Sequence, residues 1–201
     1  MMTGGAAPRK LAGALKGAAP GGGFNMDRRT LLTGGGTLLA VSALTRDAGA
    51  RFKQGAVTPE DSHFMQLAID QAKEADFPFG AVIVRDGRVL TLGRNSSKRN
   101  GDPTAHAEMV AIRAFLTGHE PEEFKKSTIY SSGEPCPMCM GAIIWCGIRR
   151  LVYAASIAQL ATQIGQINIT SQQIAEATPF TDIEIAGGLL SGNAMRVFAK
   201  D

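Results

Sequence analysis

A histidine and a glutamate two positions apart, His106 and Glu108, constrain the fold of this chain more than any other feature. In the middle of a helix, residues i and i+2 point roughly 200° apart, so the two side chains can serve one site only where a helix begins. Pro103 and Thr104, just upstream, indicate such a start. The sequence therefore predicts a helix that begins at about His106.

A second motif, CPMC at residues 136–139, has the same design. Pro137 suits the first helical position, which makes Cys136 the N-cap and places Cys139 one turn further along on the same side. A helix N-terminus carries partial positive charge and favours thiolate over thiol, and thiolates bind zinc. We therefore predict a fold that brings two helix N-termini, some 30 residues apart in the sequence, to one point.

The three predicted ligands, His106, Cys136 and Cys139, indicate one Zn²⁺ per chain with a water in the fourth position. The other two histidines are poor fourth ligands, because His63 lies on an amphipathic helix and His119 in a predicted loop. An open fourth position is typical of catalytic rather than structural zinc. Glu108 is then placed to act as the base toward that water and not as a ligand.

Each motif has a simpler explanation when it is taken alone. A Cys-x-x-Cys pair is often a redox pair or half of a structural zinc site, and a His-x-Glu pair is a common helix start. Their occurrence together, each at a predicted helix N-terminus, favours a catalytic metal site. Cys146, on an apolar helix, is expected to pack rather than react.

Residues 1–50 differ in composition from the rest and hold 11 of the 24 glycines. The pair Arg28 and Arg29 precedes an apolar run over residues 31–44, and small residues follow up to Ala50. The run is shorter than the roughly 20 residues of a membrane span and contains three glycines, so we predict a cleaved signal of the twin-arginine type. Met26 is a possible true start. The expected location is then periplasmic or exported, or cytoplasmic if the signal is not used.

Residues 51–201 are expected to form one domain. The first 50 residues hold six Lys or Arg and two Asp or Glu, so the remainder has 15 basic and 16 acidic residues. Its formal charge is −1, against +3 for the whole chain. A domain without a basic excess is not expected to hold a nucleic-acid backbone, and after signal removal no membrane span is expected.

Helical and strand patterns alternate along this domain. An amphipathic helix is predicted over residues 58–75, and the Asp86-Gly87 turn predicts a hairpin between strands at residues 81–84 and 89–92. Further strands are predicted at residues 127–132, 149–156 and 181–185, with helices at residues 106–117, 137–147, 157–164 and 171–177 and at the C-terminus. Alternation of this kind predicts a layered α/β domain.

The pair HAE and PCPMC resembles the H-x-E…P-C-x-x-C pattern of zinc-dependent nucleobase deaminases. Together with PFGAVIVRDG (78–87), GRN (93–95) and DPTAHAEMVAIR (102–113), it is similar to the zinc-dependent cytidine/deoxycytidylate deaminase superfamily, and most to its guanine deaminase and nucleoside deaminase branch. The resemblance implies a three-layer α/β/α sandwich around a five-stranded mixed sheet and a homodimer. It also implies His106, Cys136 and Cys139 as zinc ligands and Glu108 as the proton shuttle.

For the substrate, the resemblance implies Asn95 as the amide that grips a purine edge. We add Phe79 and Trp145, which offer aromatic rings for stacking on a base, and Ala105 beside the first ligand. As simpler explanations, Asn95 also suits a turn and Phe79 suits the core. Residues 157–172 lack the acidic, aromatic-flanked segment expected of a guanine deaminase, and the C-terminal residues lack the Arg-rich helix of tRNA-editing relatives.

The sequence thus predicts a zinc-dependent hydrolase that releases ammonia from a nucleobase or nucleoside, with a guanine-like purine as the expected small-molecule substrate. Two alternatives stay open. One is RNA editing of the tRNA adenosine deaminase type, and the other is a non-catalytic zinc-binding or ligand-binding module. Glu108 argues against the second, because zinc binding by itself does not require it.

Replacing Arg28 and Arg29 by lysine should retain the protein inside the cell. The twin-arginine route moves folded protein, which suits a domain whose thiolates oxidise easily once outside the cytoplasm. Immunoblots of periplasmic and cytoplasmic fractions measure the effect. Undiminished periplasmic recovery of the double-lysine variant would refute the predicted route.

Overall fold

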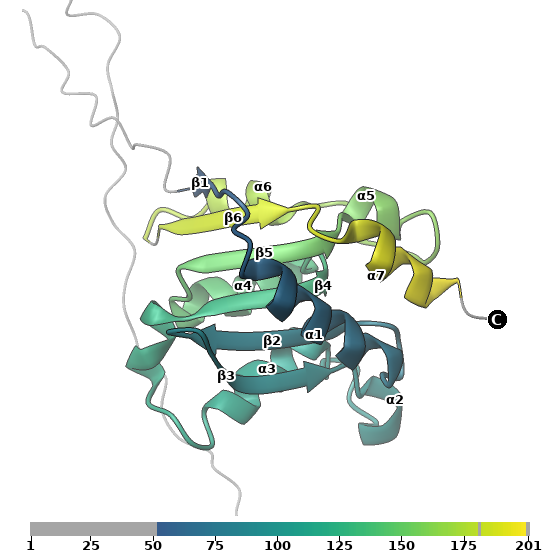
Figure 1. The fold of residues 1–201 in the computed structure, drawn as a ribbon, viewed down its shortest axis with the longest axis horizontal. Coiled ribbons are helices and arrows are strands. Elements are labelled where there is room, and N and C mark those ends of the chain that lie inside the picture. Colours follow the sequence, from purple (N-terminus) through teal and green to yellow (C-terminus); the bar gives the residue numbers. More distant parts are fainter. Residues whose placement is uncertain (1–51, 181, 200–201) are drawn as a thin grey trace, which may run out of the picture. The chain divides into compact units, whose positions relative to one another are not determined.

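The structure is a computed structural model and describes residues 52–180 and 182–199. The predicted signal over residues 1–50 lies outside the described residues. Six strands form one mixed sheet in the order β1-β6-β5-β4-β2-β3 (Figure 1). Strands β4, β5, β6 and β1 run parallel to one another, whereas β2 and β3 form an antiparallel hairpin in which β2 pairs antiparallel with β4. The strands are β1 (Phe52–Gln54), β2 (Gly80–Arg85), β3 (Arg88–Arg94), β4 (Thr128–Gly133), β5 (Arg150–Ala155) and β6 (Ile183–Gly187).

Helices cover both faces of this sheet. Two of them, α1 and α7, pack on one face, and α3, α4 and α6 lie on the other (Figure 1). The helical segments are α1 (Asp61–Lys73), α2 (Ser97–Asn100), α3 (Ala107–Phe115), the 3₁₀ helix η1 (Pro121–Lys126), α4 (Pro137–Cys146), α5 (Ile157–Leu160), α6 (Ser171–Glu176) and α7 (Ser191–Phe198). None of the helices described here is long and apolar enough to cross a membrane.

The strands are apolar on both sides because both faces are covered. In β2, Ala81 and Ile83 belong to the core beneath α3 and α4, while Val82 and Val84 belong to the core beneath α1. Alternating side chains of a strand point to opposite faces, so this one strand contributes to both cores. The predicted α/β/α sandwich is confirmed.

The predicted five-stranded sheet has a sixth strand in the structure. The additional strand is β1, in which Phe52 pairs with Ile183 and Gln54 with Ile185 in parallel register. A three-residue strand at the edge of a sheet has no periodicity long enough to be read from sequence. Its position is set by its partner β6, which lies some 130 residues further along the chain.

The hairpin between β2 and β3 follows from the Asp86-Gly87 pair. Both residues have positive φ, 50° and 70°. This is the backbone of the two-residue turn whose twist matches antiparallel strands, and glycine adopts it without strain. The predicted turn is therefore confirmed.

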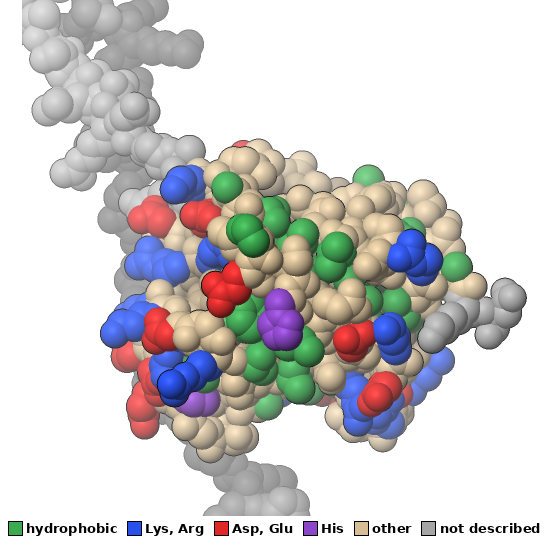
Figure 2. All heavy atoms as spheres, in the orientation of Figure 1, with side chains coloured by type: hydrophobic (Ala, Val, Ile, Leu, Met, Phe, Trp, Pro, Cys, Tyr) green, Lys and Arg blue, Asp and Glu red, His purple; other side chains and the backbone are tan. Residues whose placement is uncertain are grey.

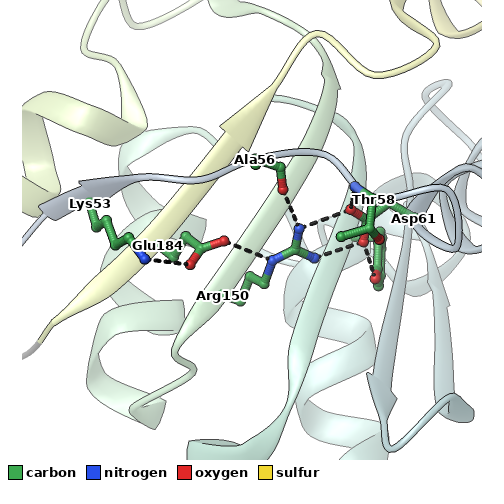
Figure 3. Close-up of polar contacts among 7 residues, drawn as sticks. Lys53, Ala56, Thr58, Asp61, Arg150 and Glu184 are labelled. Carbon is green, nitrogen blue, oxygen red and sulfur yellow. Dashed lines mark hydrogen bonds and ion pairs between the residues drawn. The ribbon is translucent and has the colours of Figure 1, made fainter.

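A polar cluster ties the segment after β1 to the start of β5 (Figure 3). The Arg150 guanidinium donates to both carboxylate oxygens of Asp61, at 2.7 and 2.9 Å, and also contacts Glu184. Tyr130 and the backbone of Thr58 donate to the same Asp61 carboxylate. Burial alone would raise the pKa of Asp61, but these hydrogen bonds outweigh it and hold the pKa well below its usual value. Asp61 is therefore a buried carboxylate with a structural role.

Close packing of α3 on β3 depends on Gly93. A Cβ atom added to Gly93 would lie 2.1 Å from the backbone oxygen of Ala107. Ala107 is the first residue of α3, directly after the predicted ligand His106. The missing side chain therefore lets the N-terminus of α3 approach the sheet, which places His106.

Replacing Gly93 by Ala should lower the free energy of unfolding by roughly 1–3 kcal/mol, because backbone must move away from the new methyl group. Zinc affinity should fall with it, since the same end of α3 carries His106. Urea denaturation and zinc titration measure the two effects. Gly192→Ala is the control, because its added Cβ meets nothing within 4 Å. Equal stability of the Gly93 and Gly192 variants would contradict this account of the packing.

Candidate metal centre and active site

The two predicted helix N-termini meet in the structure. His106 is the N-cap of α3 and Cys136 is the N-cap of α4, both with extended backbone. Pro137 occupies the first turn of α4, as the sequence predicts. Cys139, one turn into α4, is fully buried. The site lies beyond the end of β4, because Cys136 follows Gly133 by three residues.

The donor atoms of His106, Cys136 and Cys139 all lie within 4.8 Å of one another. Nδ1 of His106 is 3.6 Å from the Sγ atom of each cysteine. Tetrahedral zinc, with Zn–N near 2.0 Å and Zn–S near 2.3 Å, separates nitrogen and sulfur ligands by roughly 3.6 Å. The donor set and its spacing therefore fit zinc, with Nδ1 as the histidine ligand.

The three predicted ligands perturb one another's pKa values. The hydrogen bond from Cys139, together with His106, lowers the pKa of Cys136 and stabilises its thiolate. The same neighbouring sulfur and burial raise the pKa of Cys139. The hydrogen bond with Cys136 raises the pKa of His106. A bound divalent cation would displace the protons from both sulfurs and hold them as thiolates.

Glu108 lies beside this cluster but outside the group of donor atoms. Its side chain is 4% exposed, and its Oε1 accepts a hydrogen bond of 3.0 Å from the Ser131 hydroxyl. Burial raises the pKa of Glu108. A buried carboxyl with a raised pKa is a stronger base than an exposed one and can return the proton that it accepts. This placement suits the predicted role as a base rather than a ligand.

A cavity of about 350 Å³ is lined by two of the predicted ligands, His106 and Cys136. That volume is at the small end of the range for ligand sites. The walls come from four parts of the chain, namely the loop before β2, the segment around α2, the two ligand motifs and the loop between α5 and α6. The lining residues are Phe77, Phe79, Asn95, Ser97, Pro103, His106, Glu108, Glu134, Cys136, Ile164, Gly165, Gln166 and Ile167.

Two of the predicted substrate residues, Asn95 and Phe79, line this cavity. Asn95 is 2% exposed, and its Oδ1 accepts the backbone N–H of Ser97 at 3.1 Å, as in an Asx turn. No hydrogen bond of its Nδ2 is found among the described residues, so this donor is free for a ligand. Asn95 therefore stabilises a turn and also lines the cavity.

The other two predicted substrate residues do not line the cavity. Ala105 is buried, and its carbonyl accepts the backbone N–H of Ser96. Trp145 lies on the far part of α4 with 78% of its surface exposed, and its ring packs against Phe180 at 4.8 Å between centroids. A side chain near the end of α4 is more than one turn from the N-terminus that holds the ligands, which explains its distance from the cavity.

Sequence reasoning missed several lining residues. Ser97 carries a buried hydroxyl oxygen that lacks a hydrogen-bond partner among the described residues. Glu134 is 5% exposed and directly precedes the PCPMC motif. Within that motif, the sequence predicts a role at the site for the cysteines alone. The residues at 164–167 come from a loop whose path no local pattern indicates.

Residues 58–155 match the family model for the cytidine and deoxycytidylate deaminase zinc-binding region. A solved structure from a study of tRNA:A34 deaminases, which carry out A-to-I editing at the tRNA wobble position, is 32% identical to this chain with a TM-score of 0.57. That match covers 68% of this chain and 99% of the other. The chain belongs to the zinc-dependent cytidine deaminase family. All three predicted zinc ligands and Glu108 lie within the matched residues.

Two curated members of this deaminase family show how far the likeness extends. The guanine deaminase of Bacillus subtilis is 46% identical over 78 residues, which are 39% of this chain and 50% of that protein. The tRNA-specific adenosine deaminase of Agrobacterium fabrum is 41% identical over 100 residues, which are 48% of this chain and 66% of that protein. The matches thus span about half to two thirds of these relatives.

Replacing Cys139 by Ala should abolish stoichiometric zinc binding and lower stability, because the two helix ends lose their shared anchor. Metal analysis of the purified protein should find one zinc per wild-type chain and far less in the variant. Cys146→Ala is the matched control, since Cys146 lies on the same helix but outside the donor cluster. Full zinc content in the Cys139 variant would refute the ligand set.

Proposed function

We propose that this protein is a zinc-dependent aminohydrolase that releases ammonia from a small amino-purine, with a guanine-like base or its nucleoside as the preferred substrate. The observation that carries the proposal is Glu108, a buried carboxyl that lines the same cavity as His106 and Cys136 without belonging to the donor cluster. A site that only stores zinc has no use for a buried acid at this point. Both curated relatives are named as deaminases.

The residues of the cavity wall favour a neutral, planar substrate. Phe77, Phe79, Ile164 and Ile167 supply apolar surface, and Asn95 offers a free amide donor. Among the described residues that line the cavity, none is Lys or Arg. A phosphate group inside the cavity would therefore meet no Lys or Arg side chain among these residues, which favours a free base or a nucleoside over a nucleotide.

In the proposed reaction, Asn95 and the aromatic walls hold the ring so that its amino-bearing carbon faces Glu108. Zinc, when bound, supplies Lewis acidity and lowers the pKa of a water at its open position. Glu108 accepts a proton from the attacking water and delivers it to a ring nitrogen. A further proton transfer through Glu108 to the amino group lets ammonia leave, and a ring carbonyl remains. Ser131 keeps the carboxyl oriented through its hydrogen bond to Oε1.

RNA editing is the second candidate, because a tRNA-specific relative matches at a similar identity. The charge of residues 51–201 counts against it, and so does one face of the surface. On this face, which α1 and α7 cover, basic and acidic side chains are interspersed without a continuous basic patch (Figure 2). Release of ammonia from free amino-purines, nucleosides and pterins, compared with release from a tRNA containing adenosine at the wobble position, distinguishes the two candidates.

Replacing Glu108 by Gln should lower the deamination rate by roughly 10⁴-fold, because the amide keeps the shape but cannot accept a proton and the group acts in several steps. Zinc content should stay at the wild-type value. Ammonia release from amino-purines measures the rate, and Glu176→Gln, an exposed glutamate on α6, is the control. A near wild-type rate in the Glu108 variant would refute the mechanism. A zinc-loaded wild type inactive on every amino-purine, pyrimidine and pterin would support the non-catalytic alternative.

The predicted homodimer stays a prediction, which sedimentation of the purified protein tests directly. The surface of α4 that carries Trp145 is exposed in the single chain, and Phe180 beside it is 52% exposed. Apolar side chains of this size on a surface are typical of contacts between proteins.

A further inference from the structure

The loop between α5 and α6 forms part of the wall of the cavity that His106 and Cys136 also line. Ile164, Gly165, Gln166 and Ile167 line the cavity from this loop. The segment 157–171, from the start of α5 to the start of α6, therefore shapes the space that a substrate occupies. What holds this segment in place bears directly on substrate binding.

One side chain, Glu134, holds both ends of this segment. Its Oε2 accepts the backbone N–H of Ile157, and its Oε1 accepts the backbone N–H of Ser171, each at 2.8 Å. The Ser171 hydroxyl also donates to the Pro135 carbonyl at 3.4 Å. Every other hydrogen bond found for residues 157–171 joins near neighbours in the sequence. Polar attachment of the segment to the described remainder of the protein thus runs through Glu134 and Pro135.

The environment of Glu134 explains why a carboxylate is needed here. Ile157 and Ser171 are the first residues of α5 and α6, and the Ser156 and Thr170 caps bind other N–H groups of the same helix starts. Glu134 therefore complements two helix N-termini at once. It is 5% exposed, and no Lys, Arg or His pairs with it in the described part of the chain. Two N–H donors are thus its main partners.

Glu134 is also fixed relative to the metal ligands. It precedes the ligand Cys136 by two residues, and its backbone N–H donates to the Ala155 carbonyl at 2.7 Å, at the end of β5. The carboxylate therefore stands on the sheet edge that carries the site. We propose that Glu134 is a positioning residue that holds segment 157–171 against the cavity and thereby sets substrate affinity; the substrate part of this inference rests on the proposed function.

The first test replaces Glu134 by Gln in the zinc-loaded protein. The shape is kept, but one carboxylate oxygen becomes an NH₂ group that cannot accept an N–H, so one end of the segment is released. Amide hydrogen exchange within residues 157–171 should rise about tenfold or more, as expected for loss of a hydrogen bond to a charged group. For amino-purine hydrolysis, KM should rise about tenfold while kcat changes less, because a wall contacts ground state and transition state alike.

Asp61→Asn is the matched control. Asp61 is another buried, hydrogen-bonded carboxylate, and its partner Arg150 is the first residue of β5 (Figure 3). Glu134, in contrast, contacts the last residue of β5. This variant should lower stability without raising exchange in segment 157–171 and without changing KM. If both variants raise exchange in the segment equally, general destabilisation explains the effect and the proposal fails.

A second pair of variants tests the attachment of the segment without changing Glu134, which itself lines the cavity. Ser171→Pro removes the donating N–H, and proline is tolerated at the first helical position after an extended residue such as Thr170 (φ −74°, ψ 157°). Ser171→Ala keeps the N–H and removes only the hydroxyl. Exchange and KM should rise in the proline variant and stay near wild type in the alanine variant.

The exchange measurement needs no substrate, so it separates the two proposals. Raised exchange in Glu134→Gln and Ser171→Pro, with no hydrolysis of any amino-purine by the wild type, would support the anchor and overturn the proposed function. Unchanged exchange in both variants would overturn the anchor whatever the enzyme hydrolyses. Raised exchange with unchanged KM would overturn the claim that the segment sets affinity.

Discussion

The structure depends on two helix N-termini that meet at one edge of the sheet. His106 and Cys136 cap α3 and α4, and both helices must point their first turns at the same place for three ligand atoms to lie within 4.8 Å. The parallel strands β4 and β5 end at this edge, as is usual for ligand sites in open α/β sheets. Gly93 completes the arrangement, because its missing side chain lets α3 lie close to β3.

Buried polar side chains are divided between the two ends of the sheet. At the end away from the site, Asp61 and Arg150 satisfy one another and neighbouring groups (Figure 3). At the site, Glu108 and Glu134 are carboxylates without such an ion pair in the described residues, and each is held by hydrogen bonds alone. Burying a carboxyl in this way costs stability, which is typical of groups kept for chemistry or for positioning.

Some of the residues that line the cavity lie after the last residue of the family match. The match covers residues 58–155, whereas the wall at residues 164–167 lies beyond it. The matched part carries the three predicted zinc ligands, Glu108 and Asn95. The residues that complete the cavity wall are therefore not covered by the family model.

The sequence by itself predicted the cluster of His106, Cys136 and Cys139 and the layered fold. Proline and cap residues locate helix starts within a few positions, and a ligand set such as His106 with Cys136 and Cys139 has few other uses. The Asp86-Gly87 turn likewise requires only local backbone preferences. These features are set by neighbours along the chain, so they can be read without the tertiary structure.

Only the tertiary structure decided which other side chains reach the site. The pairing of β1 with β6 and the attachment of Ile157 and Ser171 to Glu134 join residues far apart in sequence, and no local pattern records them. Trp145 lies outside the cavity for the same reason, because a residue close to the ligand motif in the sequence need not be close to the site in space. Long-range contacts depend on how helices and strands pack, and packing is what the single sequence leaves undetermined.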